Sequence, residues 1–301
     1  MTKTNFYHPK FFPTWLMILL MISVANLPFN VQVFLGKYTG KLLYRILKRF
    51  RNIATINISN CFPKKNKHQV DELVKQNFES IGISFFETAS AFFAGSKKIN
   101  KDLTVYNQEY LTNALESGKG VILLSGHFMP LMLGGRALLL KHTIANIYRP
   151  QNNKLFDDLM RRRFIKNGAV MIKNKDTRSM LKAIKNSLPI WYAPDQDLGI
   201  QSSVFAPFFN IPTATILATS RLAKAPNTVV IPFSFVRSTS GYEMRFEKAI
   251  ENYPSGNDIS DATKTNQILQ SQILRAPEQY LWIHKRFKTR RDGESTFYEG
   301  I

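Results

Sequence analysis

The segment VILLSGHFMPLM (residues 121–132) is the part of the sequence that indicates the fold most clearly. Its apolar run over 121–125 is typical of a buried strand, and Pro130 suits the first turn of a following helix. His127 therefore lies in a short connection between the carboxyl end of a strand and the amino end of a helix. Open α/β sheets place their binding and catalytic sites at this edge. A histidine there can act as a general base, since its ordinary pKa is near 6.5, or it can be a structural residue bonded to a loop carbonyl.

On both sides of this stretch, short apolar runs alternate with helical patterns, which indicates a sheet flanked by helices. We expect strands at residues 121–125, 144–148, 169–172, 190–193, 229–235 and 242–247. We expect helices at residues 69–95, 108–117, 130–141, 154–167, 177–187, 213–224 and 260–275. A short polar connection joins the last two strands and predicts a hairpin. The predicted fold is therefore α/β with a mixed sheet.

The composition is that of an ordered globular protein with a strong positive charge. Of 301 residues, 44% are hydrophobic, and the formal net charge is +20, which attracts polyanions, anionic lipid head groups or acidic proteins. Cys61 is the single cysteine, so an intrachain disulfide or a site built on several thiolates is excluded. The sequence has no glycine-rich phosphate loop, which argues against a nucleotide enzyme.

The N-terminal region predicts a membrane anchor over residues 1–38, followed by one domain over 39–301. Residues 14–27 are almost wholly apolar, although about 20 residues are needed to span a bilayer. A cleaved signal peptide is the competing interpretation, because Ser23-Val24-Ala25 resembles a cleavage site. The basic flank over 37–51 favours an uncleaved anchor, spanning or interfacial, with the domain on the cytoplasmic side. Residues 39–63 read as a cationic amphipathic helix, which suits an anionic bilayer or a surface helix packed on the core.

Polar side chains also follow two further predicted strands. Arg149 stands beside Asn152 and Asn153, and an arginine among amides can grip a phosphate or carboxylate, or form a surface ion pair. Asp195 and Asp197 follow the strand at 190–193 and can orient a donor, bind a cation or cap a turn. If the sheet is wound in the usual way, these groups converge on one edge with His127. A last cluster over 280–291 interleaves aromatic and basic residues, which suits nucleic acid, a phosphorylated lipid or a solvated surface.

Read in order, six motifs resemble the lauroyl acyltransferases of bacterial lipid A biosynthesis, in the lysophospholipid acyltransferase superfamily. They are NISNCFP (57–63), SGHF (125–128), YRPQNN (148–153), WYAPDQD (191–197), FAPFF (205–209) and WIHKRFKTR (282–290). The resemblance implies a glycerol-3-phosphate-acyltransferase-like fold and a Gram-negative inner-membrane enzyme. Such an enzyme moves a fatty acyl chain from acyl carrier protein to a hydroxyl of a Kdo-bearing lipid A precursor. It implies no metal, no cofactor beyond the carrier-protein thioester and no nucleic-acid partner.

The resemblance also implies roles for individual residues. His127 matches the first position of the family's His-x4-acid motif, but Met132 stands where the acid is expected. A thioether cannot hold the imidazole tautomer, so Asp195 or Asp197 could substitute. Arg149 would steady an anionic group, and Asn152, Asn153, Asp195 and Asp197 would hold substrate. The tail cations Lys285, Arg286 and Lys288 would meet acceptor phosphates. The alternative is a paralogue that has lost turnover and binds lipid or carrier protein.

Overall fold

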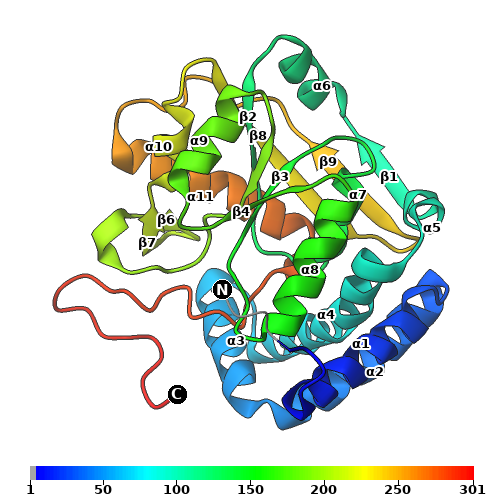
Figure 1. Cartoon of the computed structure of the whole chain (residues 1–301). Helices are drawn as coiled ribbons and strands as arrows, with labels where there is room; N and C mark the ends of the chain where they lie inside the picture. Colours follow the sequence, from blue (N-terminus) through cyan, green and yellow to red (C-terminus); the bar gives the residue numbers. More distant parts are fainter. Residues whose placement is uncertain (1–4) are drawn as a thin grey trace.

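The sheet at the centre of the fold is mixed, as predicted. The computed structural model describes residues 5–301, in which a seven-stranded sheet has the order β1-β9-β8-β2-β5-β3-β4 (Figure 1). All neighbouring strands pair in parallel except β8 and β9, which form the predicted antiparallel hairpin. The strands are β1 (Leu103–Tyr106), β2 (Gly120–Leu124), β3 (Ala145–Tyr148), β4 (Val170–Lys173), β5 (Ile190–Tyr192), β8 (Thr228–Arg237) and β9 (Tyr242–Phe246). The six predicted strands are thus confirmed, and β1 is additional.

Helices cover both faces of the sheet because β2 is apolar on each side. Val121 and Leu123 pack in one core cluster with residues of α4, α6, α7 and α8, whereas Ile122 and Leu124 pack in another with α9 and α10. All five residues of β2 are buried, as a central parallel strand requires. The helices are α4 (Lys67–Phe93), α5 (Ser96–Lys101), α6 (Glu109–Glu116), α7 (Leu131–Leu138), α8 (Lys154–Lys166), α9 (Thr177–Lys185), α10 (Ala218–Ala223) and α11 (Asp258–Arg275).

Two N-terminal helices form a hairpin against α4 in place of the predicted single anchor. They are α1 (Phe12–Ala25) and α2 (Phe29–Ile46), and α3 (Lys48–Cys61) follows (Figure 1). The crossing of α2 and α4 depends on glycine, since a Cβ on Gly40 would lie 2.3 Å from the Phe78 carbonyl oxygen and one on Gly82 2.1 Å from that of Gly36. Helix α2 is therefore packed backbone to backbone on α4, and it continues across the expected boundary at residue 38. Residues 1–4 of the predicted anchor lie outside the described residues.

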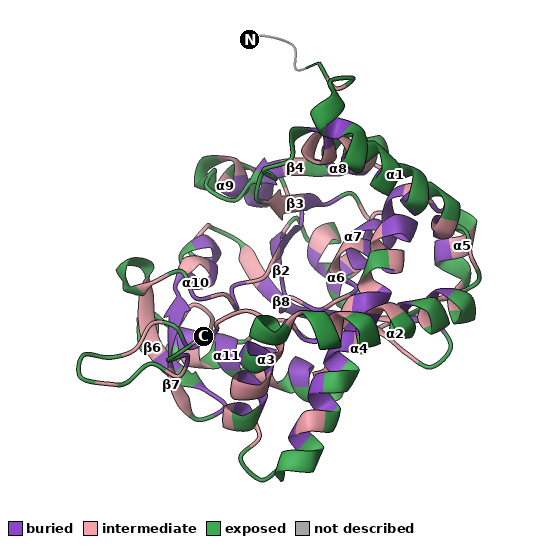
Figure 2. Ribbon diagram, turned by 90° about the horizontal axis from the view of Figure 1, so that it is seen from below, coloured by how far each residue is buried: buried purple, intermediate pink, exposed green. Residues whose placement is uncertain are grey.

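Much of α1 and α2 is exposed, as the green segments of the two helices in Figure 2 show, and many of the exposed side chains are apolar. These side chains include Phe12, Leu16, Leu19, Leu20, Ile22, Val31, Phe34, Tyr38, Leu42 and Ile46. Within residues 5–301, no helix combines the length and the apolarity needed to cross a bilayer. The 14 residues of α1 extend only about 21 Å at 1.5 Å per residue, so the prediction of a spanning anchor is not supported.

A small hairpin replaces part of a predicted helix. Residues 213–224 were expected to be helical, but β6 (Ser203–Phe208) and β7 (Ile211–Ile216) form an antiparallel pair, and helix α10 begins only at Ala218. Phe209 and Asn210, between the strands, both have positive φ, which matches the two-residue turn that a tight hairpin uses. The alternation of Thr213 and Thr215 with apolar residues is a strand pattern that the sequence-based assignment missed.

Candidate active site

The strand β2 delivers His127 to the carboxyl edge of the sheet, as predicted. The Ser125 N–H donates to the Tyr192 carbonyl at 3.1 Å, which extends the pairing of β2 with β5 by one residue. The chain then turns at Gly126, where a Cβ would come within 3.3 Å of Asp195 Oδ2 and of the Tyr280 ring. Pro130 is the residue that precedes helix α7. His127 therefore stands in the expected strand-to-helix connection, with a carboxylate packed closely beneath it.

Asp195 supplies the carboxylate that position 132 lacks. His127 Nδ1 lies 2.5 Å from Asp195 Oδ1, and the His127 backbone N–H donates to Asp195 Oδ2 at 2.8 Å. The Asp195 side chain is only 1% exposed, whereas that of His127 is 27% exposed. Of the two acids that the sequence offered as substitutes, Asp195 reaches the imidazole. This pairing holds the tautomer with hydrogen on Nδ1, so that Nε2 is left as a proton acceptor.

The pairing shifts the pKa of both groups. Burial tends to lower the pKa of His127, but the charge of Asp195 and the hydrogen bond to it raise that pKa above its ordinary value. Burial tends to raise the pKa of Asp195, but the charge and the two hydrogen bonds of His127 lower it. The carboxylate is therefore ionised at neutral pH, and it favours the imidazolium that forms whenever Nε2 takes a proton.

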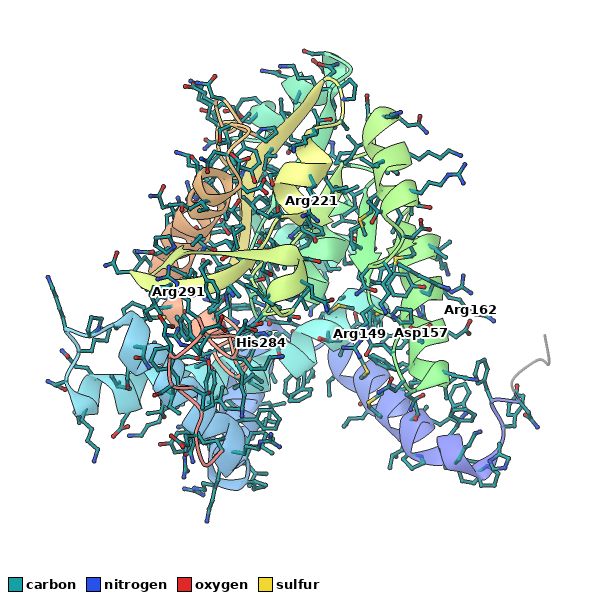
Figure 3. All side chains as sticks on the ribbon, turned by 90° about the vertical axis from the view of Figure 1, so that its left-hand side faces the viewer. Arg149, Asp157, Arg162, Arg221, His284 and Arg291 are labelled. Atoms are coloured by element: carbon teal, nitrogen blue, oxygen red, sulfur yellow. The ribbon has the colours of Figure 1, made fainter. Side chains whose placement is uncertain are left out.

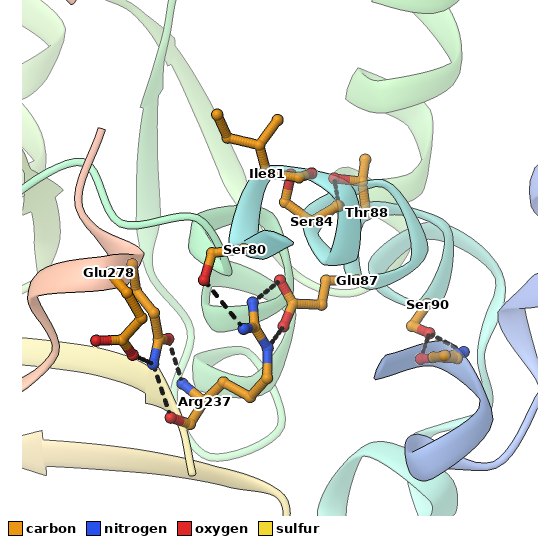
Figure 4. Close-up of polar contacts among 10 residues, drawn as sticks. Ser80, Ile81, Ser84, Glu87, Thr88, Ser90, Arg237 and Glu278 are labelled. Carbon is orange, nitrogen blue, oxygen red and sulfur yellow. Dashed lines mark hydrogen bonds and ion pairs between the residues drawn. The ribbon is translucent and has the colours of Figure 1, made fainter. Parts of the chain in front are cut away.

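The segment around residue 280 clamps the His127 loop from the other side. The Met129 N–H donates to the Gln279 carbonyl at 2.8 Å, and the Leu281 N–H donates to the His127 carbonyl at 3.0 Å. Gln279 exchanges two hydrogen bonds with the backbone of Arg237, at 2.7 and 2.9 Å. Arg237 in turn forms a buried ion pair with Glu87 at 2.8 Å, drawn in Figure 4. The loop is thus tied through buried polar contacts to the end of β8 and to α4.

A cavity lies beside His127. It has a volume of about 310 Å³ and a predominantly apolar lining. Of the lining residues, Arg149 and Leu198 are exposed, whereas Gly135, Met160, Phe164 and Trp191 are buried. The full lining is His127, Leu131, Met132, Gly135, Asn146, Ile147, Tyr148, Arg149, Met160, Phe164, Met171, Asn174, Trp191, Tyr192, Ala193, Gln196, Leu198 and Ile216. Met132, which replaces the expected acid, thus faces an apolar space next to the imidazole.

The amide residues after β3 divide between the cavity and the fold. Arg149, labelled in Figure 3, is exposed and lines the cavity. Asn153 caps α8 by accepting from the Leu155 and Phe156 N–H groups, and it donates to Thr14 of α1 at 2.7 Å. Asn152 is exposed and does not line the cavity. Of this predicted group, Arg149 lines the same cavity as His127, and Asn153 joins α8 to α1.

Asp197 holds the C-terminal segment rather than the imidazole. Its carboxylate accepts from the Thr289 N–H at 2.6 Å and from the Thr289 hydroxyl at 2.7 Å. The Asp197 N–H donates to His284 Nε2 at 3.0 Å. Burial lowers the pKa of His284, so its neutral form is favoured. His284 is not among the site residues predicted individually, although it stands inside the motif at 282–290.

Of the three tail cations expected to meet phosphates, Arg286 is placed differently. Arg286 is 2% exposed, lies over the Phe208 ring, and donates to the Ala214 carbonyl at 2.7 Å. Lys285 Nζ donates to the Ile301 carbonyl at 3.0 Å. Lys288 is exposed. The expectation for Arg286 is therefore corrected, because its guanidinium is buried and bonded to β7.

Among residues 5–301, no group of three or more His, Cys, Asp and Glu side chains is arranged to hold a metal ion. What the geometry offers is a proton acceptor held by a buried carboxylate, at one side of an apolar cavity. Such a pair can deprotonate a hydroxyl that attacks a carbonyl, in the manner of the His–Asp part of a hydrolase triad.

Comparison with known protein families gives a match over nearly the whole chain. Residues 1–289 match the family described as "Bacterial lipid A biosynthesis acyltransferase". A lipid A biosynthesis palmitoleoyltransferase of Escherichia coli K12 is 35% identical over 98% of this chain and 97% of its own. A lipid A biosynthesis lauroyltransferase of the same organism is 34% identical over 98% of both chains. A lipid A biosynthesis acyltransferase of Haemophilus influenzae is 32% identical over 96% of this chain and 94% of its own.

Proposed function

Because the chain belongs to the bacterial lipid A biosynthesis acyltransferase family, we propose that it moves a fatty acyl chain from acyl carrier protein to a hydroxyl of a Kdo-bearing lipid A precursor. The observation that carries the proposal is the pairing of His127 with buried Asp195 beside an apolar cavity. The cavity suits a hydrocarbon chain, and a chain bound there with its thioester beside His127 would have its carbonyl next to a proton acceptor.

His127 Nε2 takes the proton of the acceptor hydroxyl as its oxygen attacks the thioester carbonyl. The new C–O bond forms, the C–S bond breaks, and the imidazolium returns its proton to the leaving thiolate. Asp195 keeps hydrogen on Nδ1 and stabilises the imidazolium during the transfer. Met132 has no part in this proton transfer, so the proposed mechanism predicts turnover where the alternative, a paralogue without turnover, predicts none.

Arg149 is proposed to hold an anionic group of the donor or acceptor, because it is an exposed guanidinium at the cavity that contains the imidazole. The net charge of +20 favours association with an acidic carrier protein and a phosphorylated lipid. Lys288 and Asn152 are exposed and remain candidates for contact with these substrates.

The site of action is proposed to be the cytoplasmic face of the bacterial inner membrane, with the hairpin α1–α2 in the lipid interface. Leu16, Leu19 and Leu20 on α1 are each more than 60% exposed, which is unusual for neighbouring leucines on a protein surface in water. Basic residues over 37–51 continue from this apolar face and suit anionic head groups.

Two measurements test the proposed function. Purified protein is incubated with acyl carrier proteins charged with different chains and with the lipid A precursor, and the products are analysed by mass spectrometry. Lipid A from cells with and without the gene is compared in parallel. We expect transfer in vitro and one missing acyl chain in the deletion strain. No transfer from any donor, together with unchanged lipid A, would refute the proposal.

A further inference from the structure

The lining of the cavity is partly exposed and partly buried. Leu198 and Arg149 are exposed. Three lining residues are almost fully buried, with Met160 at 6%, Phe164 at 5% and Trp191 at 8% exposure. Together with α7, these residues of α8 and β5 form the buried part of the lining, which limits the room for an apolar chain.

Helix α7 lines the cavity with Met132 and Gly135, which are three residues apart and so lie on one face of the helix. Gly135 lies about 4.5 Å further along the helix axis than Met132, at 1.5 Å per residue. A Cβ added to Gly135 would lie 3.3 Å from the Phe164 ring and 3.7 Å from the Trp191 ring. The missing side chain of Gly135 thus leaves space where the cavity is enclosed.

Gly134 and Gly135 are adjacent on α7, but the absence of a side chain has a different effect at each position. A Cβ on Gly134 would come within 2.8 Å of the Phe235 ring and 2.9 Å of Trp191, so Gly134 is required for packing of α7 on the sheet. A Cβ on Gly135 would be 3.3 Å from the Phe164 ring, which would have to shift by a few tenths of an ångström, and an interior helix position prefers alanine by about 1 kcal/mol. Its glycine therefore contributes room in the cavity rather than an essential close approach.

We propose that Gly135, facing Phe164 and Trp191, sets the length of the acyl chain that this enzyme accepts. The inference rests on the proposed function and adds the residue that determines chain length. Each methylene that fits or fails to fit an apolar pocket changes selectivity by about 10- to 200-fold. A methyl group at position 135 shortens the available space by about one carbon.

The test compares Gly135→Ala with Phe164→Leu, which removes ring atoms from the same buried part of the cavity lining. Gly95→Ala is the matched control, because a Cβ there meets nothing within 4 Å. Transfer is measured with saturated donors from decanoyl to palmitoyl. We expect the ratio of kcat/KM for the longest accepted chain to that for a shorter one to fall about tenfold or more in Gly135→Ala. The ratio should rise in Phe164→Leu and stay unchanged in Gly95→Ala.

Binding of the corresponding free fatty acids, measured by displacement of a fluorescent fatty acid, gives a second readout that needs no turnover. The proposal is overturned if both cavity variants keep the chain-length profile of the wild type in both measurements. If Gly135→Ala fails to fold in a thermal melt, Phe164→Leu decides alone. If the wild type transfers no chain but the variants still shift fatty-acid preference, the proposed function fails and the assignment of Gly135 stands.

Discussion

Replacing Asp195 with asparagine tests the proton transfer most severely, because the substitution keeps shape and removes charge. Asp195 accepts two hydrogen bonds from His127, one from the backbone N–H and one from the ring. An amide has one acceptor and one donor group, so it cannot accept both. With the amide oxygen on the backbone N–H, its NH₂ group donates to Nδ1 and forces hydrogen onto Nε2, where the base must be free.

We expect kcat of Asp195→Asn to fall by about 10⁴, as in hydrolase triads, which corresponds to about 5 kcal/mol of barrier height. The assay is acyl transfer under saturating donor and acceptor. Asp258→Asn, an exposed acid at the start of α11, is the matched control and should keep wild-type turnover. If folded Asp195→Asn retained more than about a tenth of kcat, Asp195 would have no role in orienting the base.

The pH profile gives the same test in another form. Activity requires neutral His127, whose pKa is raised above its ordinary value by Asp195, so kcat/KM should decline as pH falls through that raised pKa. In Asp195→Asn the decline in kcat/KM should move to lower pH. If kcat/KM declined at the same pH in both proteins, the coupling of His127 to Asp195 would be contradicted.

The stability of the fold should also depend on pH through Asp195. Because the pKa of Asp195 is lowered on folding, its contribution to stability is present above its unfolded pKa of about 3.9 and is lost as pH falls towards the folded pKa.

Three further substitutions have defined outcomes. Met132→Glu should lower kcat/KM, because it places a carboxylate in an apolar space while Asp195 already holds the ring; increased transfer would show that the motif acid is needed. Gly82→Ala should destabilise the fold by about 1–3 kcal/mol through overpacking against α2, seen as a lower Tm than that of Gly95→Ala; an unchanged Tm would mean that α2 is not held in close contact. Arg286→Ala should lower Tm because it empties a buried site bonded to β7, whereas Lys288→Ala should not; equal Tm values would contradict the structural role of Arg286.

The position of His127 could be predicted because it depends on local signals. A buried strand, a short turn and a helix start follow one another within residues 121–132, and the edge of the sheet follows from that order. For the carboxylate that pairs with His127, the sequence offered two candidates, Asp195 and Asp197. Asp195 lies 68 residues from His127 along the chain, and Asp195 and Asp197 stand in the same motif. The turn after β5 places Asp195 against the imidazole. Thr289 donates two hydrogen bonds to Asp197 and holds that carboxylate elsewhere.

The prediction that Arg286 meets a phosphate was wrong because it depended on an incorrect secondary structure at β7. Arg286 is buried because it bonds to Ala214 and Thr215 of β7, and β7 lies in a segment predicted to be helical. Without that hairpin, nothing in the sequence indicates a buried partner for an arginine in a basic run. The N-terminal hairpin was likewise beyond local signals, because Gly36 and Gly40 matter only through their contacts with α4.

The proposed reaction depends on His127 Nε2, which removes the proton from the acceptor hydroxyl. The decisive experiment is single-turnover transfer from acyl carrier protein to the lipid A precursor by a His127→Ala variant with an unchanged thermal melt. We expect the acylated product to fall below detection in the variant, while the wild type completes its turnover. Formation of that product by folded His127→Ala at the wild-type rate would contradict this role of His127.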